Sequence, residues 1–245
     1  AKKKYTGYHM EARQCTEFVC DRYVKLMSSF WVPFLFCEIV SLFLNPSSFS
    51  SYGSTVGKVA ASMAVEALGF SEFFGTPKHI GTWWYISLAV LVIVVLPLLW
   101  VLYRRYGSVL LFGLFLFLPP MLLDTGKNIF RFLLCIPLAI FCADQGLLER
   151  YKNWSWCGRP LLDGSLKVIW TFIFLIFAMY IRKTDWGSKY MEYPLVTVVA
   201  FLVILLAYAV LDHMAPVRNV LIYLGKHSGD MFFIHTFFRG IWFEG

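Results

Sequence analysis

The sequence predicts an all-α membrane protein, a polytopic bundle of transmembrane helices. Of its 245 residues, 59% are hydrophobic and only 15% are charged, and the mean hydropathy is +0.65. A soluble domain is closer to half apolar and a quarter charged. The excess lies in long runs such as Trp83–Tyr103 and Pro194–Leu211, and about 20 apolar residues in a helix match the hydrocarbon thickness of a bilayer.

Six apolar segments predict spans, and a seventh begins near Ser228 and runs to the end of the chain. The six are roughly Ser28–Leu44, Thr82–Tyr103, Ser108–Leu123, Ile129–Ala143, Lys167–Ile181 and Pro194–Leu211. Just before the seventh, the stretch VRNVLIYLG is too short to span a bilayer. It predicts a short helix lying at the membrane surface.

The chain predicts one transmembrane domain over 1–245, with its long outside loop at 45–81. The later part of that loop, GKVAASMAVEALGFSEFFG, has small and apolar residues at helical spacing and predicts an amphipathic helix. The 144–166 loop contains Trp154 and Trp156. Tryptophans collect at membrane interfaces, so this loop predicts an interfacial segment on the cytoplasmic side.

The distribution of basic residues predicts the orientation. The net charge is +7, but no soluble segment shows a basic patch interleaved with aromatics, so nucleic acid is not an expected partner. Lys and Arg collect in cytoplasmic loops, and more of them fall on the side of the N-terminal segment, which we therefore expect in the cytoplasm. That side holds Lys2, Lys3, Lys4, Arg13, Arg22, Lys25, Arg104, Arg105, Arg150, Lys152, Arg159, Arg218 and Lys226, and the other side holds Lys58, Lys78, Lys127, Arg182, Lys183 and Lys189.

Signatures of soluble enzymes are missing from the sequence. It contains no GxxxxGK[ST], GxGxxG, HExxH or GxSxG pattern, which argues against a P-loop ATPase, a dinucleotide enzyme, a zincin and an α/β-hydrolase. The six cysteines show no metal-type CxxC spacing. We therefore expect neither a metal site nor a disulfide framework.

Two cations mark the start of the first span. Arg22 and Lys25 are three residues apart in FVCDRYVKLMSSFWVPF, so on a helix they share one face. Such a pair can grip a phosphate-bearing ligand at the cytoplasmic surface. It can equally be an ordinary basic flank that meets lipid phosphates.

A carboxyl group is expected near the middle of the first span. Glu38 lies about ten residues into Ser28–Leu44, and a charge at that depth is expensive. We expect it to face the bundle interior, neutral or paired. It serves either proton transfer or substrate binding, or it makes a structural bond to a neighbouring helix.

A polar stripe is predicted on the last helix, in LGKHSGDMFFIHTFFRG. Ser228, His235 and Arg239 are separated by seven and four residues, so they lie within about 20° of one another on a helix. A polar stripe on an aromatic helix faces protein or a cavity rather than lipid. We expect it to line a substrate chamber, with Glu38 as the partner of Arg239.

Together these motifs resemble acyltransferase family three, the bacterial integral-membrane acyltransferases. FVCDRYVKLMSSFWVPF is similar to the family's RxxR segment at Arg22 and Lys25, and WWYISLAVLVIVVLPLL is similar to its Trp-led helix at Trp84 and Tyr85. LGKHSGDMFFIH is similar to its late motif at Ser228 and His235, and FRFLLCIPLAIFCADQ to a further segment. Lys25 stands where the family has a second Arg, and Gly229 where it has Tyr.

The resemblance implies a fold of about ten helices, of which these spans would be the third to the ninth. The chain would then be partial at both ends, and the histidine that the family uses as general base would precede Ala1. His235 is a candidate base within the chain. Arg22 and Lys25 would bind the donor, and the substrate would meet Glu38, Trp84, Tyr85, Ser228, His235 and Arg239.

The implied activity is transfer of an acyl group, commonly acetyl, from acyl-CoA to a hydroxyl of a surface carbohydrate or lipid-linked glycan. Acyl-CoA would be a substrate, and no tightly bound cofactor is expected. The implied location is the bacterial inner membrane, in contact with lipid. The alternative is a transporter or flippase of a polar lipid or glycan, which paired discontinuous helices in two related halves would favour; the sequence shows no such repeat.

Overall fold

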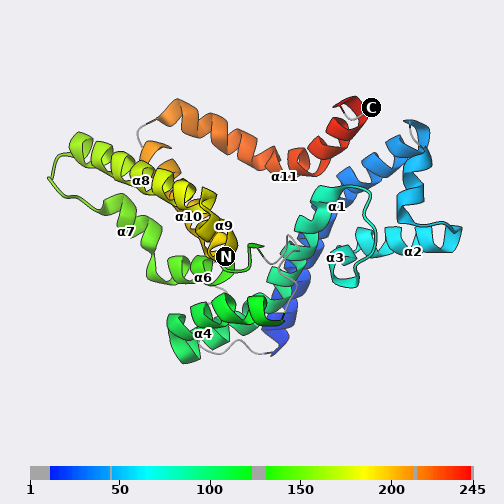
Figure 1. Ribbon diagram of the computed structural model, residues 1–245, viewed down its shortest axis with the longest axis horizontal. Helices are drawn as coiled ribbons and strands as arrows, with labels where there is room; N and C mark the ends of the chain where they lie inside the picture. Colours follow the sequence, from blue (N-terminus) through cyan, green and yellow to red (C-terminus); the bar gives the residue numbers. More distant parts are fainter. Residues whose placement is uncertain (1–11, 45, 123–130, 212–213, 244–245) are drawn as a thin grey trace. The chain divides into compact units, whose positions relative to one another are not determined.

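The structure, a computed structural model, describes residues 12–44, 46–122, 131–211 and 214–243 (Figure 1). It is 88% helical, and no strand occurs in these ranges, which confirms the all-α class. Of the basic residues used to orient the chain, Lys2, Lys3, Lys4 and Lys127 lie outside the described residues. The elements are α1 (Ala12–Leu44), η1 (Pro46–Tyr52), α2 (Val56–Ala67), α3 (Ser71–Phe74), η2 (Gly81–Trp83), α4 (Trp84–Leu122), α6 (Cys135–Gln145), α7 (Leu147–Asn153), α8 (Pro160–Lys183), α9 (Asp185–Tyr190), α10 (Glu192–Leu211) and α11 (Ala215–Phe243).

Four of the described helices are long and apolar enough to cross a membrane, where the sequence predicts seven spans. They cover Arg13–Leu44, Gly81–Phe117, Leu162–Lys183 and Glu192–Leu211. The first, fifth and sixth predicted spans correspond to α1, α8 and α10. The second and third fall together in α4, because the short basic stretch between them forms no loop and breaks the helix only at Gly107. Leu123, the last residue of the third prediction, lies outside the described residues.

Gly107 interrupts α4 between these two predicted spans. Its backbone has φ 82° and ψ 177°, while the residues on either side are helical. This region of backbone space is open essentially to glycine alone. The break therefore redirects the chain without a loop.

The remaining two predicted spans differ from the structure. Of Ile129–Ala143, residues 129 and 130 lie outside the described residues, and the helix α6 begins only at Cys135. Its 11 residues extend only about 16 Å at 1.5 Å per residue. The seventh prediction placed a helix start near Ser228, but α11 begins at Ala215 and runs on to Phe243. The helix thus includes the stretch expected to lie at the surface, together with Arg218 and Lys226.

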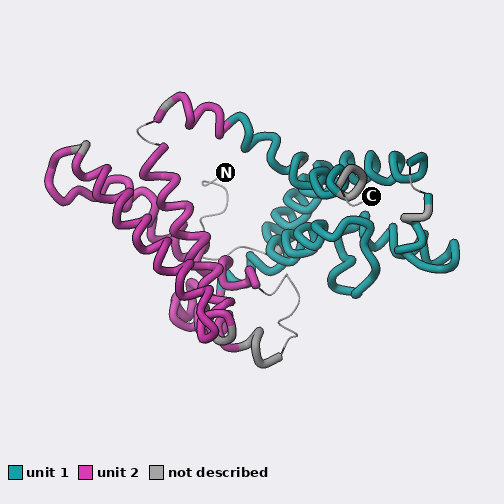
Figure 2. The backbone as a smooth tube through the Cα atoms, turned by 45° about the horizontal axis from the view of Figure 1, so that its top comes forward, with its two compact units in different colours: residues 1–101, 223–245 teal, residues 102–222 magenta. Residues whose placement is uncertain are grey.

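The chain divides into two compact units (Figure 2). Unit 1 comprises residues 1–101 and 223–245, and unit 2 comprises residues 102–222. The core of unit 1 joins α1, α11 and the start of α4 through aromatic rings. The buried rings are Phe30, Phe34, Trp83, Phe233 and Phe237, and the indole N–H of Trp83 donates to the Phe233 carbonyl at 3.1 Å.

The segment 46–80 packs on α1 within unit 1. The helix expected there is confirmed as α2, which begins after Thr55, whose hydroxyl caps the helix by accepting from the Lys58 N–H at 3.4 Å. The end of α2 is held by side chains of α1. The Tyr23 hydroxyl donates to the Leu68 carbonyl at 3.0 Å, and the Trp31 indole donates to the Ala67 carbonyl at 2.8 Å.

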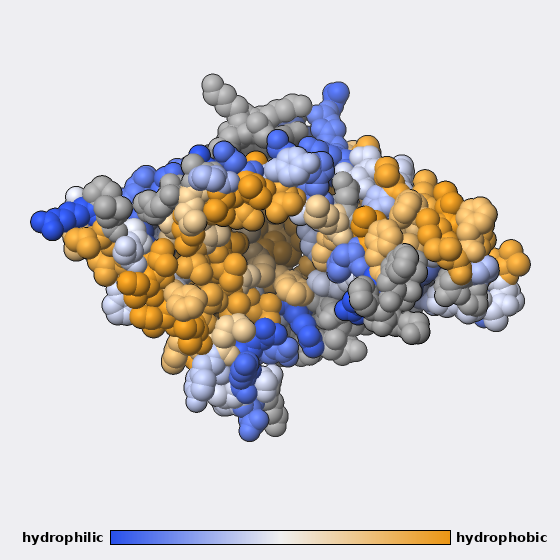
Figure 3. Space-filling model, turned by 90° about the horizontal axis from the view of Figure 1, so that it is seen from above, coloured by the Kyte–Doolittle hydropathy of each residue, from blue (hydrophilic) through white to orange (hydrophobic). Residues whose placement is uncertain are grey.

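Unit 2 is built around the paired helices α8 and α10. Much of their apolar surface is exposed, including Phe172, Phe174 and Phe177 on α8. Figure 3 shows hydrophobic side chains gathered over broad areas of the molecular surface. Exposed apolar surface on this scale is foreign to a monomer in water and is what a helix facing lipid presents.

The break at Gly107 supplies a prediction about stability. Gly107→Ala should destabilise the protein by about 1–3 kcal/mol, because alanine must adopt a backbone conformation that only glycine tolerates. Gly113→Ala is the matched control, since Gly113 lies in the same helix and no neighbour stands within 4 Å of an added Cβ. Alanine there should be neutral or stabilising by up to about 1 kcal/mol. Thermal unfolding in detergent, followed by circular dichroism, measures both, and equal effects would contradict the strained backbone.

Candidate functional site

Five polar side chains of unit 1 lie together, four of them buried and His79 half-buried, and we call them the carboxyl–histidine cluster. α1 contributes Glu38 and Ser41, η1 contributes Tyr52, α2 contributes Glu66, and His79 precedes η2. Tyr52 and Glu66 are each only 1% exposed. Buried polar groups are costly unless they bond to one another, so this grouping needs a chemical account.

Tyr52 joins the two carboxyl groups. Its hydroxyl lies 2.8 Å from Glu38 Oε1 and makes a still shorter contact with Glu66 Oε2. A phenol has one proton to donate, so it satisfies only one carboxylate. The second contact requires a proton from a carboxyl group, and the arrangement therefore holds one of the two glutamates in the protonated form.

The surroundings indicate that Glu66 holds this proton. Burial raises the pKa of the Glu66 carboxyl from its ordinary value of 4.5 to about 7. Burial, followed by the charges of Glu66 and Glu38, also raises the pKa of the Tyr52 hydroxyl, which keeps the phenol protonated. Glu38 Oε1 meets a ring nitrogen of His79 as well as the Tyr52 hydroxyl.

His79 is held through both ring nitrogens. Its Nδ1 lies 3.0 Å from Glu38 Oε1, and its Nε2 lies 3.2 Å from the Ser41 hydroxyl. If Nδ1–H donates to the carboxylate, Nε2 is the lone-pair nitrogen that accepts from the serine. The backbone N–H of His79 also donates to Glu66 Oε2 at 3.2 Å, so both carboxyl groups fix the position of this residue.

Two oxygens of the cluster have no hydrogen-bond partner among the residues that the structure describes. Glu38 Oε2 and Glu66 Oε1 are buried without a hydrogen bond, and both side chains are more than nine-tenths buried. A buried oxygen without a hydrogen bond is rare in a folded protein and leaves these atoms able to accept a further donor. Among the described residues, no group of three or more His, Cys, Asp or Glu side chains is arranged to hold a metal ion.

Glu38 is the predicted site residue that belongs to the cluster, and its partners differ from the predicted one. Glu38 is buried as expected, but it pairs with Tyr52 and His79, so the predicted Glu38–Arg239 ion pair is wrong. The reason lies in α11, where Phe233 and Phe237 are the buried positions. Arg239 is exposed.

The rest of the predicted stripe also lies on the exposed side of α11. Ser228 and His235 are exposed, so the stripe does not face the core of unit 1 as expected. The imidazole of His235 is bonded within its own helix, to the Phe232 carbonyl at 2.7 Å and to the Thr236 hydroxyl at 3.0 Å. Aromatic side chains take the inward face because they bury far more apolar area than serine or histidine.

The other predicted site residues are not members of the cluster. Trp84 is half-buried and Tyr85 is exposed, with its ring against Phe232 at 5.3 Å between centroids. Arg22 and Lys25 are exposed on α1, as a ligand-binding pair requires, and the Arg22 guanidinium lies 5.7 Å from the Phe18 ring.

Sequence reasoning missed four residues of the cluster, Ser41, Tyr52, Glu66 and His79. The last three lie in the predicted outside loop, and their bonds within the cluster join positions 13 to 41 residues apart in the chain. One signal was present. Glu66 is the single acidic residue of VGKVAASMAVEA, an otherwise small and apolar helix in which a carboxyl group needs a buried partner.

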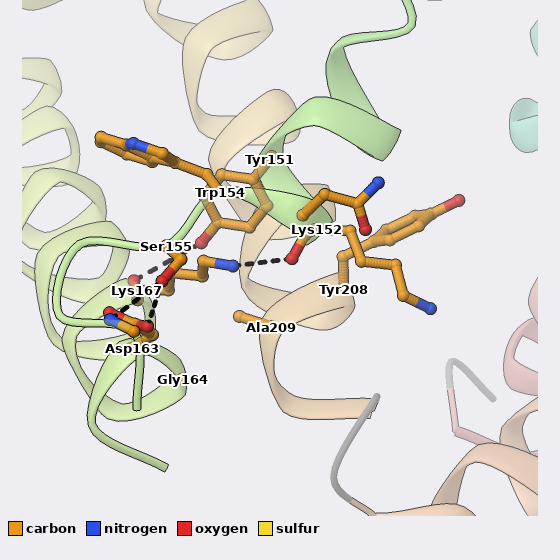
Figure 4. Close-up of a pocket in the computed structure, with 11 residues that line it drawn as sticks. Tyr151, Lys152, Trp154, Ser155, Asp163, Gly164, Lys167, Tyr208 and Ala209 are labelled. Atoms are coloured by element: carbon orange, nitrogen blue, oxygen red, sulfur yellow. Dashed lines mark hydrogen bonds between the residues drawn. The ribbon is translucent and has the colours of Figure 1, made fainter. Parts of the chain in front are cut away.

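Unit 2 contains a separate pocket beside the Trp154 loop (Figure 4). It has a volume of about 260 Å³ and adjoins an aromatic pocket of about 480 Å³. The polar groups here bond to one another. Asp163 accepts from the Ser155 hydroxyl at 2.6 Å and from the Trp156 and Cys157 N–H groups at 2.8 Å each, and Lys167 Nζ donates to the Lys152 carbonyl at 2.7 Å.

This pocket is organised by structural bonds, and its walls are largely aromatic and aliphatic. The larger part is lined by Trp154, Trp156, Trp170, Phe174, Leu202 and Leu205 among others. Such walls suit a hydrocarbon chain, whereas the histidine paired with a carboxyl group lies in the cluster of unit 1.

Comparison with protein families, curated proteins and solved structures gives no match: no family model, no curated protein and no solved structure is similar to this chain. The resemblance in the sequence motifs therefore stays an expectation.

The raised pKa of Glu66 predicts how stability depends on pH. The folded state retains the Glu66 proton up to about pH 7, whereas the unfolded chain loses it near 4.5. Stability should therefore fall as pH rises between these values, by up to about 1.4 kcal/mol for each pH unit. Glu66→Gln should flatten this slope, and Glu17→Gln, which removes an exposed carboxyl, is the matched control. Chemical unfolding between pH 4 and 8 tests this, and an unchanged slope in Glu66→Gln would contradict the assignment.

Proposed function

We propose that the protein is a membrane acyltransferase, which transfers an acyl group, acetyl in the simplest case, from acyl-CoA to a hydroxyl of a surface carbohydrate or lipid-linked glycan. The observation that carries the proposal is the position of His79 between a carboxylate and a hydroxyl. A base, an orienting acid and an oxygen nucleophile are the groups that acyl transfer needs.

In this proposal His79 is the general base. Its Nε2 takes the proton from a hydroxyl as that oxygen attacks the thioester carbonyl, and the carbon–sulfur bond breaks. The departing thiolate then receives the proton from His79, so the base is regenerated. Glu38 is the positioning residue, because its bond to Nδ1 keeps the lone pair of Nε2 directed at the hydroxyl.

General-base catalysis of this kind contributes about 10²–10⁴ in rate. The resemblance instead assigns the base to a histidine preceding Ala1, and His235 was the candidate within the chain. His79 has the geometry that His235 lacks, since the ring of His235 is bonded within its own exposed helix turn.

Arg22 and Lys25 are the proposed donor site. Both are exposed on one face of α1, where a guanidinium and an ammonium can bind the phosphates of CoA. Lys25 and Glu38 are about 20 Å apart along the helix at 1.5 Å per residue. The arm of the donor that carries the thioester would have to extend along α1 toward the cluster.

The membrane setting is part of the proposal. Four helices can cross a bilayer, and the excess of basic residues favours an N-terminal segment in the cytoplasm. A bacterial inner membrane would place Arg22 and Lys25 on the side of cytoplasmic acyl-CoA. The part of the segment 45–81 beside the end of α1, with Tyr52 and His79, would then lie toward the acceptor, while its Leu68 reaches back to Tyr23 on α1.

Transport is the alternative class, and it has less support. The expected pathway joined Glu38 to His235 and Arg239. In the structure Glu38 is engaged with Tyr52 and His79, and the two other residues are exposed.

Transfer from radiolabelled acetyl-CoA by the full-length protein in its native membranes tests the proposed base. His79→Gln should lower the rate of transfer at least 100-fold, because glutamine cannot take the proton. His227→Gln, which removes an exposed histidine, should leave the rate unchanged. Wild-type rates in His79→Gln would exclude His79 as the base.

The KM for acetyl-CoA tests the proposed donor site separately. Arg22→Ala with Lys25→Ala should raise the KM for acetyl-CoA about tenfold or more while changing kcat little, because the lost contacts are to phosphates remote from the thioester. Arg13→Ala is the matched control on the same helix, where the side chain pairs with Glu17. An unchanged KM in the double variant would remove these residues from the donor site.

A further inference from the structure

The hydroxyl held by His79 belongs to the protein itself. Ser41 is 3% exposed and lies on α1 three residues after Glu38, so both side chains are on the same face of the helix. The Ser41 hydroxyl is 3.2 Å from His79 Nε2, and His79 Nδ1 is 3.0 Å from Glu38 Oε1. A nucleophile, its base and the group that orients the base thus follow one another within hydrogen-bonding distance.

This bond joins a serine within a helix to a different segment of the chain, as the bond from Ser62 to the Tyr52 carbonyl also does. Such a serine commonly donates to a backbone carbonyl of the preceding turn, as other serines of this chain do. The hydroxyls of Ser28 and Ser29 donate to the Lys25 carbonyl, and that of Ser228 donates to the Gly225 carbonyl. The hydroxyl of Ser41 is directed across to His79 instead.

The orientation of His79 is enforced from several sides. Tyr52 bonds to the same oxygen of Glu38 that His79 meets, and Glu66 accepts the backbone N–H of His79. The imidazole also packs edge-on against the Phe49, Tyr52 and Phe237 rings, at 5.8, 5.8 and 6.4 Å between centroids. A ring clamped in this way does not need to reorganise when it takes a proton.

We infer that Ser41 is a catalytic nucleophile that carries the acyl group as an ester between donor and acceptor. This inference rests on the proposed acyltransferase function and adds a covalent step to it. The ligand class is an acyl thioester.

The step balances in two halves. First, Ser41 Oγ attacks the thioester carbonyl and gives its proton to His79; the carbon–sulfur bond breaks, and the thiolate leaves with that proton as free CoA. Second, the acceptor hydroxyl attacks the Ser41 ester and gives its proton to His79. The carbon–Oγ bond then breaks, and Ser41 recovers its proton.

An acyl group held covalently on Ser41 suits the proposed positions of the acyl-CoA donor and the glycan acceptor. Ser41 lies one turn before the end of α1 at Leu44, next to the segment that would face the acceptor, while the donor cations lie toward the other end of the helix. With the acyl group on Ser41, CoA can depart before the glycan reacts. Phe49, which is half-buried over His79, covers the site on the side of η1.

Acyl-serine formation can be tested without any acceptor. The full-length protein in lipid nanodiscs is incubated with acetyl-CoA, digested and examined by mass spectrometry. We expect one acetyl group on Ser41. Ser41→Ala should carry none, His79→Gln should acquire it at least 100-fold more slowly, and Ser28→Ala, a serine on the same helix, should be labelled like the wild type.

A second variant guards against a trivial loss of folding in Ser41→Ala. Ser41→Cys should form a thioester at the same position, which neutral hydroxylamine removes, whereas the wild-type ester survives that treatment. Labelling of Ser41→Cys without hydroxylamine sensitivity would contradict acylation at this position.

The outcomes separate this inference from the proposed function. Suppose that the wild type transfers acetyl groups to glycan, that position 41 is acylated neither in the wild type nor in Ser41→Cys, and that Ser41→Ala transfers at the wild-type rate. The covalent carrier is then wrong, and direct transfer stands. If the wild type neither transfers acetyl groups nor forms an ester, both proposals fail.

Discussion

The hydroxyl of Tyr52 is the contact on which unit 1 depends. It connects Glu38 of α1 with Glu66 of α2. It therefore holds the segment 46–80 against α1. Neither carboxyl group is tolerable in its position alone, because an uncompensated buried charge is strongly destabilising. The proton on Glu66 removes one charge, and Tyr52 and His79 hydrogen-bond to the carboxyl group of Glu38. The same two carboxyl groups fix His79 beside Ser41. The same hydrogen bonds therefore hold the loop on α1 and form the candidate site.

Around this contact the fold follows the rules of an apolar environment. The described backbone is helical, which satisfies its hydrogen bonds within each segment. The long helices expose apolar side chains outward, and the aromatic core of unit 1 joins α1 with α11 through Phe30, Trp83 and Phe233. Polar chemistry is confined to places where groups can pair, which explains why the cluster gathers at the end of α1 nearest its loop.

Much of the fold could be predicted from sequence, because helical class and the spans of α8 and α10 follow from uninterrupted apolar runs. The number of spans could not, since hydropathy does not distinguish a loop from the single-residue break at Gly107. Glu38 was recognised because a carboxyl group in an apolar span must find a partner. Its partner was misassigned to Arg239, since the rotation of α11 is decided by Phe233 and Phe237. Tyr52 and His79 could not be predicted, because long-range contacts in an irregular loop leave no periodic signal in the sequence.

The central claim is that the carboxyl group of Glu66 is protonated, and infrared spectroscopy detects this proton directly. The carbonyl stretch of a protonated carboxyl group is resolved from that of a carboxylate. In the full-length protein at about pH 6, below the raised pKa of Glu66, we expect a protonated-carboxyl band that disappears in Glu66→Gln and shifts in Tyr52→Phe, which removes the hydrogen-bonding hydroxyl. A wild-type spectrum without that band, or a band unchanged in Glu66→Gln, would contradict the bridge and with it the placement of His79.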